Sequence, residues 1–114
     1  MGIQIFGTKK SADTRKAERF FKERGVKYQY VDMNEKGLSR GEFNAVLQAA
    51  GEVENLIDPN AKDTDSLTLL RYLSPEDQKE KLFENQSLIK LPIVRSGKAV
   101  AVGYEPEKWK TMII

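Results

Sequence analysis

The start of the chain carries two short apolar stretches that are separated by the length of one helix. Ile3 to Gly7 and Val26 to Asp32 both have the composition and alternation of strands, the first of them mostly buried. Between them, apolar residues recur at helical spacing from residue 13 to about 25, where a glycine suits the end of a helix. Two strands joined by one helix and short turns normally pair in parallel with a right-handed crossover. The pattern therefore predicts an α/β fold that begins with a βαβ unit.

Helical signals dominate the middle of the chain. Ser39 lies three residues before a glutamate, which is the spacing of a capping box, and the apolar residues that follow predict a helix from about 40 to 50. Asp63 or Thr64 can cap a second helix. Ser74 is followed directly by a proline and two acidic residues, which suit the first turn of a third helix.

The last part of the chain returns to strands. The segment "LPIVRSGKAVAVGY" predicts two strands that turn at Ser96-Gly97, and "EPEKWKTMII" predicts a terminal helix with Trp109 and Met112 facing inward. The whole order is β-α-β, several helices and β-β-α, which is typical of the thioredoxin-like fold with a helical insertion. We expect a four-stranded mixed sheet with flanking helices in one domain over residues 1–114, with thioredoxin-like halves at about 1–35 and 90–114 and the insertion at about 38–89.

Charge and hydropathy argue against two classes of partner. The chain has 19 Lys and Arg against 17 Asp and Glu, a net charge of +2, and the two signs are mixed along the sequence. A protein that follows nucleic-acid phosphates needs a broad basic field, so direct binding to nucleic acid is not expected. No stretch approaches the roughly 20 apolar residues that span a bilayer, and the N-terminal apolar run is too short for a signal peptide. We expect a cytoplasmic protein without a membrane partner.

The chain contains neither cysteine nor histidine. Without cysteine there is no thiolate nucleophile, no redox disulfide and no thiolate ligand for a metal, and without histidine there is no imidazole base and no usual zinc ligand. The acidic residues of "DPNAKDTD" lack the spacing of a calcium loop. We therefore expect no metal site and no resident cofactor, and the sequence leaves open whether the protein is an enzyme.

The turn "GTKKSADTRKA" connects the first strand to the first helix. The start of a helix presents free backbone N–H groups, which hold anions in many proteins. Ser11, Thr14 and Arg15, together with the N–H groups of residues 12–14, are therefore candidate anion-binding groups. Asp13 favours the alternative that Ser11 only caps the helix, because a carboxylate in the first turn occupies the same positive potential.

Three stretches of the sequence resemble the arsenate reductase (ArsC) and Spx family of thioredoxin-like proteins. They are "IFGTKKSADTRKAERFFKERGV" with Arg15-Lys16-Ala17, "LIKLPIV" at 88–94 and "AVGYEPEKW" at 101–109. They occur in the family's order and at its separations along essentially the whole chain. The resemblance implies a thioredoxin-like fold and makes Pro92, at the start of the third strand, a candidate for a cis peptide bond.

The resemblance also implies that the family's sulfur is missing. Aligned on the Arg-Lys-Ala triplet, Ser11 stands at the position of the family's catalytic cysteine, and Ser11 and Thr14 stand at the two positions of the Spx Cys-x-x-Cys switch. A register shifted by one residue puts Ala12 at the cysteine position instead, so neither register provides a thiol. Reduction of arsenate or of a disulfide needs a sulfur that forms S–O–As or S–S bonds, and a serine hydroxyl cannot replace it.

The anion-binding arginines of the family are replaced as well. The arginine before the proline is Leu91 in this sequence, and the arginine of the middle segment falls near Asn60. Lys90 precedes Leu91, but an extended strand would point its side chain to the opposite face. We therefore expect no catalytic residue, and a site that has lost its reductase chemistry.

Two functions remain in view. The first is a non-catalytic binding or regulatory module, for which the likeness to Spx implies transcription regulation through contact with the α subunit of RNA polymerase. The family's contact region resembles Gly51 and the acidic segment after it, although Gly51 also suits a simple helix end. The alternative is an arsenate reductase-like oxidoreductase that uses an external thiol such as glutathione.

Overall fold

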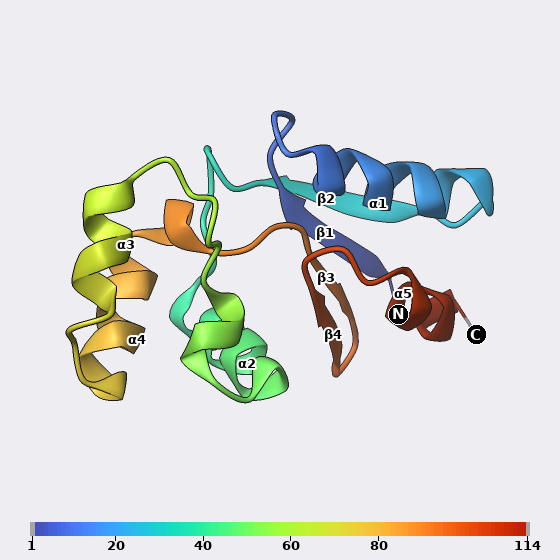
Figure 1. The fold of residues 1–114 in the computed structure, drawn as a ribbon. Helices are drawn as coiled ribbons and strands as arrows, with labels where there is room; N and C mark the ends of the chain where they lie inside the picture. Colours follow the sequence, from blue (N-terminus) through green and yellow to red (C-terminus); the bar gives the residue numbers. More distant parts are fainter. Residues whose placement is uncertain (1, 114) are drawn as a thin grey trace.

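The computed structural model describes residues 2–113 and contains one four-stranded sheet surrounded by helices (Figure 1). The elements, with η for a 3₁₀ helix, are β1 (Ile3–Gly7), α1 (Ala12–Glu23), β2 (Tyr28–Asp32), α2 (Arg40–Ala50), η1 (Val53–Leu56), α3 (Thr64–Leu70), α4 (Pro75–Glu84), η2 (Gln86–Leu88), β3 (Ile93–Ser96), β4 (Ala99–Val102) and α5 (Pro106–Ile113). They follow the predicted order, and the insertion helices from α2 to η2 all fall between residues 40 and 88. None of the helices in this described range is long and apolar enough to cross a bilayer.

The sheet is mixed and has the strand order β2-β1-β3-β4. β1 pairs in parallel with β2, from Ile3 opposite Tyr28 to Gly7 opposite Asp32, which confirms the predicted βαβ unit. β1 also pairs antiparallel with β3, and β3 pairs antiparallel with β4, so the predicted hairpin is present. β2 and β4 therefore form the two edges of the sheet.

Each face of the sheet packs against its own set of helices. Ile5 and Val94 belong to one buried cluster, whereas their neighbours Phe6 and Ile93 belong to the other, because successive side chains of a strand point to opposite faces. The first cluster includes α1 and α5, with the fully buried Trp109, and the second includes α2 and the rest of the insertion. Full burial of a large apolar side chain contributes about 1.5–3 kcal/mol, so both layers stabilise the sheet.

Contacts between the beginning and the end of the helical insertion hold its two ends together, and the sequence did not predict them. Ile57 and Ile89 form an isolated antiparallel bridge, which is flanked by two backbone hydrogen bonds of 2.8 and 2.7 Å. The side chain of Gln86 adds a second link: its Oε1 accepts from the Leu38 N–H at 2.6 Å, and its Nε2 donates to the Leu38 carbonyl at 3.0 Å. These contacts fix where the insertion leaves and re-enters the sheet.

Helix α2 is held at its first turn by Glu42. Ser39 and Glu42 form the predicted capping box: the Ser39 Oγ accepts from the Glu42 N–H at 3.2 Å, and the Glu42 Oε1 accepts from the Ser39 N–H at 2.9 Å. The other carboxylate oxygen of Glu42 lies 3.7 Å from Nη1 of Arg95 on β3. One side chain therefore both caps the helix and joins it to the sheet.

One strand starts later than the sequence predicts. β2 begins at Tyr28 rather than at Val26. The N–H of Val26 donates to the Phe21 carbonyl at 2.9 Å, so this residue belongs to the end of α1. Gly25, with a φ of +67°, lets the chain turn back at that point.

Gly7→Ala should destabilise the protein, because a Cβ at this position would lie 2.3 Å from Thr14 Oγ1. Overpacking of this kind lowers the free energy of unfolding by about 1–3 kcal/mol. Gly41→Ala in helix α2 is the matched control, since a Cβ there meets nothing within 4 Å. Urea denaturation measures both variants, and a Gly7→Ala protein as stable as the wild type would contradict the close packing of α1 on β1.

Candidate functional site

The turn between β1 and α1 ends in a closed helix cap. Ser11 has the extended backbone of an N-cap residue, and its Oγ accepts a hydrogen bond from the Thr14 N–H at 3.1 Å. The Ser11 N–H donates in turn to the Thr8 carbonyl, also at 3.1 Å. The hydroxyl at the position where the family resemblance expects a cysteine therefore holds the first turn of the helix.

The charged side chains of this turn have partners within it. Asp13 lies in the first turn, where its carboxylate suits the positive end of the helix dipole, and it pairs with Lys16 Nζ at 3.6 Å. The Arg15 guanidinium donates to the backbone carbonyl of Lys9. An anion at this helix start would compete with the Asp13 carboxylate for the same positive potential. The Arg15 guanidinium, which could otherwise bind the anion, already donates to the loop before the helix.

Thr14 fills the space between helix and sheet. Its side chain is fully buried, and its Oγ1 has no hydrogen-bond partner within residues 2–113. The helix lies so close to β1 that a Cβ at Gly7 would collide with this threonine. Thr14 is therefore a packing residue, and its backbone N–H is already used by the cap.

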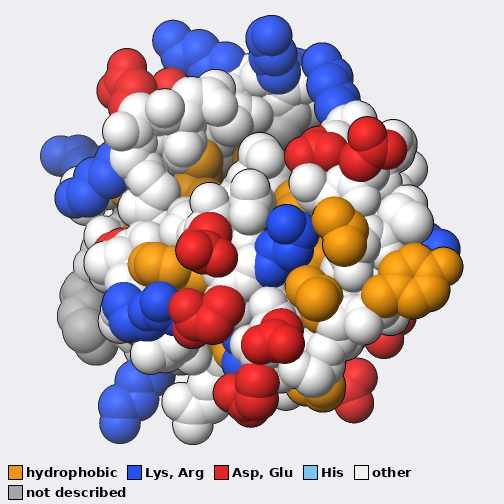
Figure 2. Space-filling model, turned by 90° about the vertical axis from the view of Figure 1, so that its left-hand side faces the viewer, with side chains coloured by type: hydrophobic (Ala, Val, Ile, Leu, Met, Phe, Trp, Pro, Cys, Tyr) orange, Lys and Arg blue, Asp and Glu red, His pale blue; other side chains and the backbone are white. Residues whose placement is uncertain are grey.

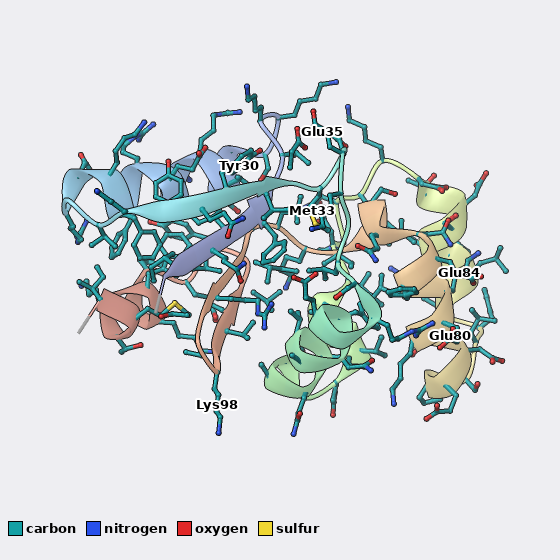
Figure 3. The ribbon with its side chains drawn as sticks, turned by 180° about the vertical axis from the view of Figure 1, so that it is seen from behind. Tyr30, Met33, Glu35, Glu80, Glu84 and Lys98 are labelled. Carbon is teal, nitrogen blue, oxygen red and sulfur yellow. The ribbon has the colours of Figure 1, made fainter. Side chains whose placement is uncertain are left out.

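A cleft of about 920 Å³ opens beside the turn. Three segments line it: the turn with the first residues of α1, the loop at 58–63 and the segment at 86–91 before β3. Met33 also lines the cleft and lies where the sheet meets the insertion (Figure 3). The Leu91–Pro92 peptide bond, directly before β3, is cis.

The cleft brings together the three positions that the resemblance assigns to the family's cysteine and two arginines. Ser11, Asn60 and Leu91 all line it. Thr14 and Arg15, the other two candidate anion-binding residues, are not part of its lining, because one is buried against β1 and the other is bound to the loop. The three positions thus lie together in one cleft, but their side chains are a hydroxyl, an amide and an aliphatic group.

Three lysines give the cleft a positive component. Lys10, Lys62 and Lys90 line it, and none has an ion-pair partner among the described residues. The expectation that Lys90 points away from the site is wrong. Its backbone N–H donates to the insertion at Leu56, so it is not part of strand β3, and its side chain passes over Gly103. The sequence could not show that Lys90 lines the cleft, because its place depends on the backbone pairing with Leu56, which is far from it in the chain.

Two carboxylates of the cleft serve the local backbone. Asp58 Oδ1 accepts from the Asn60 N–H at 2.9 Å. Asp63 is the cap of α3: its Oδ1 accepts from the Ser66 N–H at 3.1 Å, and its Oδ2 accepts from the Ser66 hydroxyl at 2.7 Å. Hydrogen bonds from the Ser66 side chain and backbone lower the pKa of Asp63 below its ordinary value. The carboxylate is therefore anionic at neutral pH.

Gly51, which the resemblance suggests as a partner contact, ends helix α2. It has a φ of +87°, and its N–H donates to the Leu47 carbonyl at 3.0 Å, which is a sufficient structural reason for a glycine. The residue is exposed, and a Cβ there would meet nothing within 4 Å. A helix end and a contact surface are both compatible with this position.

Chemically, the cleft supplies ammonium groups and hydrogen-bond donors but no thiol. A serine acts as a nucleophile only beside a base that takes its proton. The bond observed at Ser11 Oγ comes from a backbone N–H instead. Its three lysines are balanced by three carboxylates, Asp13, Asp58 and Asp63, so the lining has no net positive charge.

Comparisons with known proteins find a family and a distant relative. The sequence model of the ArsC family matches residues 6–112. The chain is 29% identical over 109 residues to the global transcriptional regulator Spx 2 of Oceanobacillus iheyensis, and the match covers 94% of this chain and 80% of the relative.

Solved structures share the fold at lower identity. A protein from Bacteroides fragilis related to the ArsC family has a TM-score of 0.86 and 22% identity, with 98% of both chains covered. Arsenate reductase from Vibrio cholerae has a TM-score of 0.82 and 23% identity, again with 98% of both chains covered. These structures show the thioredoxin-like fold of the ArsC proteins for this chain.

Ser11→Ala should lower the free energy of unfolding by about 1 kcal/mol, because it removes the oxygen that caps α1. Ser11→Asp keeps an acceptor at the same position and should retain most of the wild-type stability. Urea denaturation of both variants measures the difference. If Ser11→Ala is as stable as the wild type, the hydroxyl is not the cap and the turn is open for another role.

Proposed function

The chain belongs to the ArsC family, and on that premise we propose that it is a non-catalytic member that acts by binding another protein. The observation that carries the proposal is that Ser11, to which the resemblance assigns the family's cysteine position, serves as a helix cap. The resemblance assigns the family's two arginines to Leu91 and to the neighbourhood of Asn60, and both of these residues line the same cleft. Because all three parts are replaced together, the site is better explained by loss of catalysis than by adjustment to another substrate.

Thiol chemistry is the reason that the first replacement matters most. A reductase of this kind passes two electrons from sulfur to its substrate, and the sulfur ends in a disulfide. A serine oxygen has no comparable redox couple. A relative with a hydroxyl at this position can therefore keep the fold and the cleft while it loses the reaction.

Regulation of transcription is the form of protein binding that we favour. The relative from Oceanobacillus iheyensis is named a global transcriptional regulator, and the likeness to Spx suggests the α subunit of RNA polymerase as the partner. Gly51 and the acidic residues Glu52 and Glu54 after it are exposed, as a contact of this kind requires. Such a role would place the protein in the cytoplasm.

The lysines of the cleft support a second candidate function. Lys10, Lys62 and Lys90 have no ion-pair partner in the described part of the chain, and ammonium groups of this kind bind oxyanions and carboxylates. An external thiol such as glutathione would then supply the sulfur, and the protein would only position the reactants. Asp13 in the first turn of α1 and the missing arginines disfavour this function.

An NMR titration separates the two functions. The ¹⁵N-labelled chain is titrated with arsenate, then with sulfate and then with glutathione, while the amide signals of Ser11, Ala12 and Asp13 are followed. The non-catalytic proposal predicts no saturable shift at these amides. Saturable shifts there and at Lys90 would support an anion site and thus the function with an external thiol.

A thiol introduced by Ser11→Cys should not by itself restore reductase activity. A thiol at a helix start has a lowered pKa, but the cleft of the Ser11→Cys variant would still lack the arginines. We expect the Ser11→Cys variant to form arsenite from arsenate and glutathione no faster than the same mixture does without protein. Addition of Asn60→Arg and Leu91→Arg to Ser11→Cys should raise that rate at least about tenfold. Saturable turnover by Ser11→Cys alone would show that the cleft still binds arsenate.

A further inference from the structure

Helix α1 presents three basic side chains in one row on its outer side. Arg15, Arg19 and Lys22 are four and three residues apart, so they lie on the same side of the helix. All three are exposed, whereas the opposite side of α1 is buried against the sheet. Within residues 2–113 no other helix or strand lies over this outer side (Figure 1). We call these three residues the α1 basic row.

The three cations of the α1 basic row have no carboxylate partner. None of them forms an ion pair among the described residues. Arg15 donates through Nη1 to the Lys9 carbonyl. A guanidinium has five N–H donors, so the others remain available to another molecule.

Most carboxylates of helix α1 are engaged away from the row. Asp13 pairs with Lys16 at 3.6 Å, and the Glu18 Oε1 accepts from the Tyr28 hydroxyl at 3.1 Å. Glu23 is exposed and lies four residues after Arg19, so it borders the row, but it forms no ion pair in the described part of the chain. One carboxylate beside three cations leaves the row with a net positive charge.

The rest of the chain has the opposite sign of charge. Residues 9–27 hold eight Lys and Arg against three Asp and Glu, and the remaining residues hold 11 against 14. The excess of acid lies in the insertion, where residues 52–84 hold nine Asp and Glu against four Lys and Arg. Figure 2 shows the side of the molecule that the insertion forms, with most Lys and Arg side chains towards the edges of the view. The small net charge of the whole chain conceals this separation.

We propose that the α1 basic row binds an acidic helix of a partner protein. A helix with Asp or Glu at positions i, i+4 and i+7 presents its carboxylates at the spacing of the three cations, and charge-assisted hydrogen bonds join the two sets. The row extends only about 10 Å along the axis of α1, so it matches a short acidic segment. A nucleic-acid duplex would extend beyond the row onto the acidic remainder of the chain, which would repel its phosphates.

This surface is separate from the two sites described above. The residues of the row do not line the cleft beside Ser11. Gly51 ends α2 in the insertion, which lies on another side of the sheet from α1 (Figure 1). The inference therefore goes beyond the function proposed above, and it does not depend on whether the cleft binds an anion.

Two synthetic peptides of the same composition test this inference. Each has about 18 residues and is rich in alanine, so it is long enough to form a helix. The first has Glu at positions i, i+4, i+7 and i+11, on one face, and the second has the same number of Glu residues distributed around the helix. Each is titrated into the full-length ¹⁵N-labelled chain at about 0.1 M salt, where the Debye length is about 10 Å.

The first peptide should give saturable shifts at the amides of Arg15, Arg19 and Lys22. The second peptide cannot place its carboxylates opposite all three cations at once, so it should bind at least about fivefold more weakly. Binding of the first peptide should also weaken as the salt concentration is raised, because the contact is electrostatic.

Variants locate the contact. Arg19→Glu combined with Lys22→Glu should weaken binding of the first peptide at least about tenfold, because like charges then face each other. Arg71→Glu combined with Lys98→Glu is the matched control, since it changes the net charge equally at two exposed residues outside α1 and should leave the affinity nearly unchanged. Figure 3 shows Lys98 at the turn between β3 and β4, away from α1. Glu23→Gln removes the carboxylate beside the row and should strengthen binding.

A milder pair of substitutions protects the test against a change of fold. Arg19→Gln combined with Lys22→Gln removes both charges without reversing them and should also weaken binding of the first peptide. The amide spectrum of each variant without peptide shows whether the fold is kept.

Three results would overturn the inference: equal affinity for the two peptides, unchanged affinity of the Arg19→Glu and Lys22→Glu double variant, or no binding of either peptide. Tighter binding of a DNA duplex than of the first peptide would also overturn it, as would shifts at the row that depend on protein concentration without peptide. These last results would assign the row to nucleic acid or to a second copy of the chain. The anion titration at Ser11 decides the non-catalytic proposal separately, so failure of one can be told from failure of the other.

Discussion

The contact between Gly7 and Thr14 determines the geometry of the N-terminal half. Because Gly7 has no side chain, the first turn of α1 lies directly against the end of β1, and the buried Thr14 fills the space. The helix then starts at Ser11, whose hydroxyl caps the N–H of that same threonine. The turn and one wall of the cleft follow from this packing. Ser11, to which the resemblance assigns the family's cysteine position, is therefore part of the structural support of a helix in this chain.

Catalysis and binding place different demands on this fold. Reductase chemistry needs a thiol and cationic side chains, and the resemblance assigns these positions to Ser11, to Leu91 and to the neighbourhood of Asn60, which all line the cleft. A binding role needs only a stable scaffold with an exposed surface of defined chemistry. In the helical insertion, Leu69 and Tyr72 are exposed within an acidic segment. Under the proposed non-catalytic role, the surface of the insertion rather than the cleft would determine the function.

Local patterns were enough to predict most of the fold, because caps and strand alternation depend on neighbours in sequence. The expected caps each begin a helix: Ser39, Asp63 and Ser74. The pairing of Ile57 with Ile89 was not predictable, since it joins residues far apart in the chain, and it also brings Lys90 into the cleft. Among the candidate site residues, Ser11 lines the cleft, whereas only the tertiary packing against Gly7 shows that Thr14 is hidden.

Turnover of arsenate by the unmodified protein tests the central claim most directly. Arsenite formation is measured with glutathione and glutaredoxin as reductants, over a series of protein concentrations, with an active arsenate reductase as the positive control. The account predicts the rate of the protein-free reaction at every concentration, because no atom of this chain can take the place of the thiol. A rate that rises with protein concentration and saturates with arsenate would contradict it.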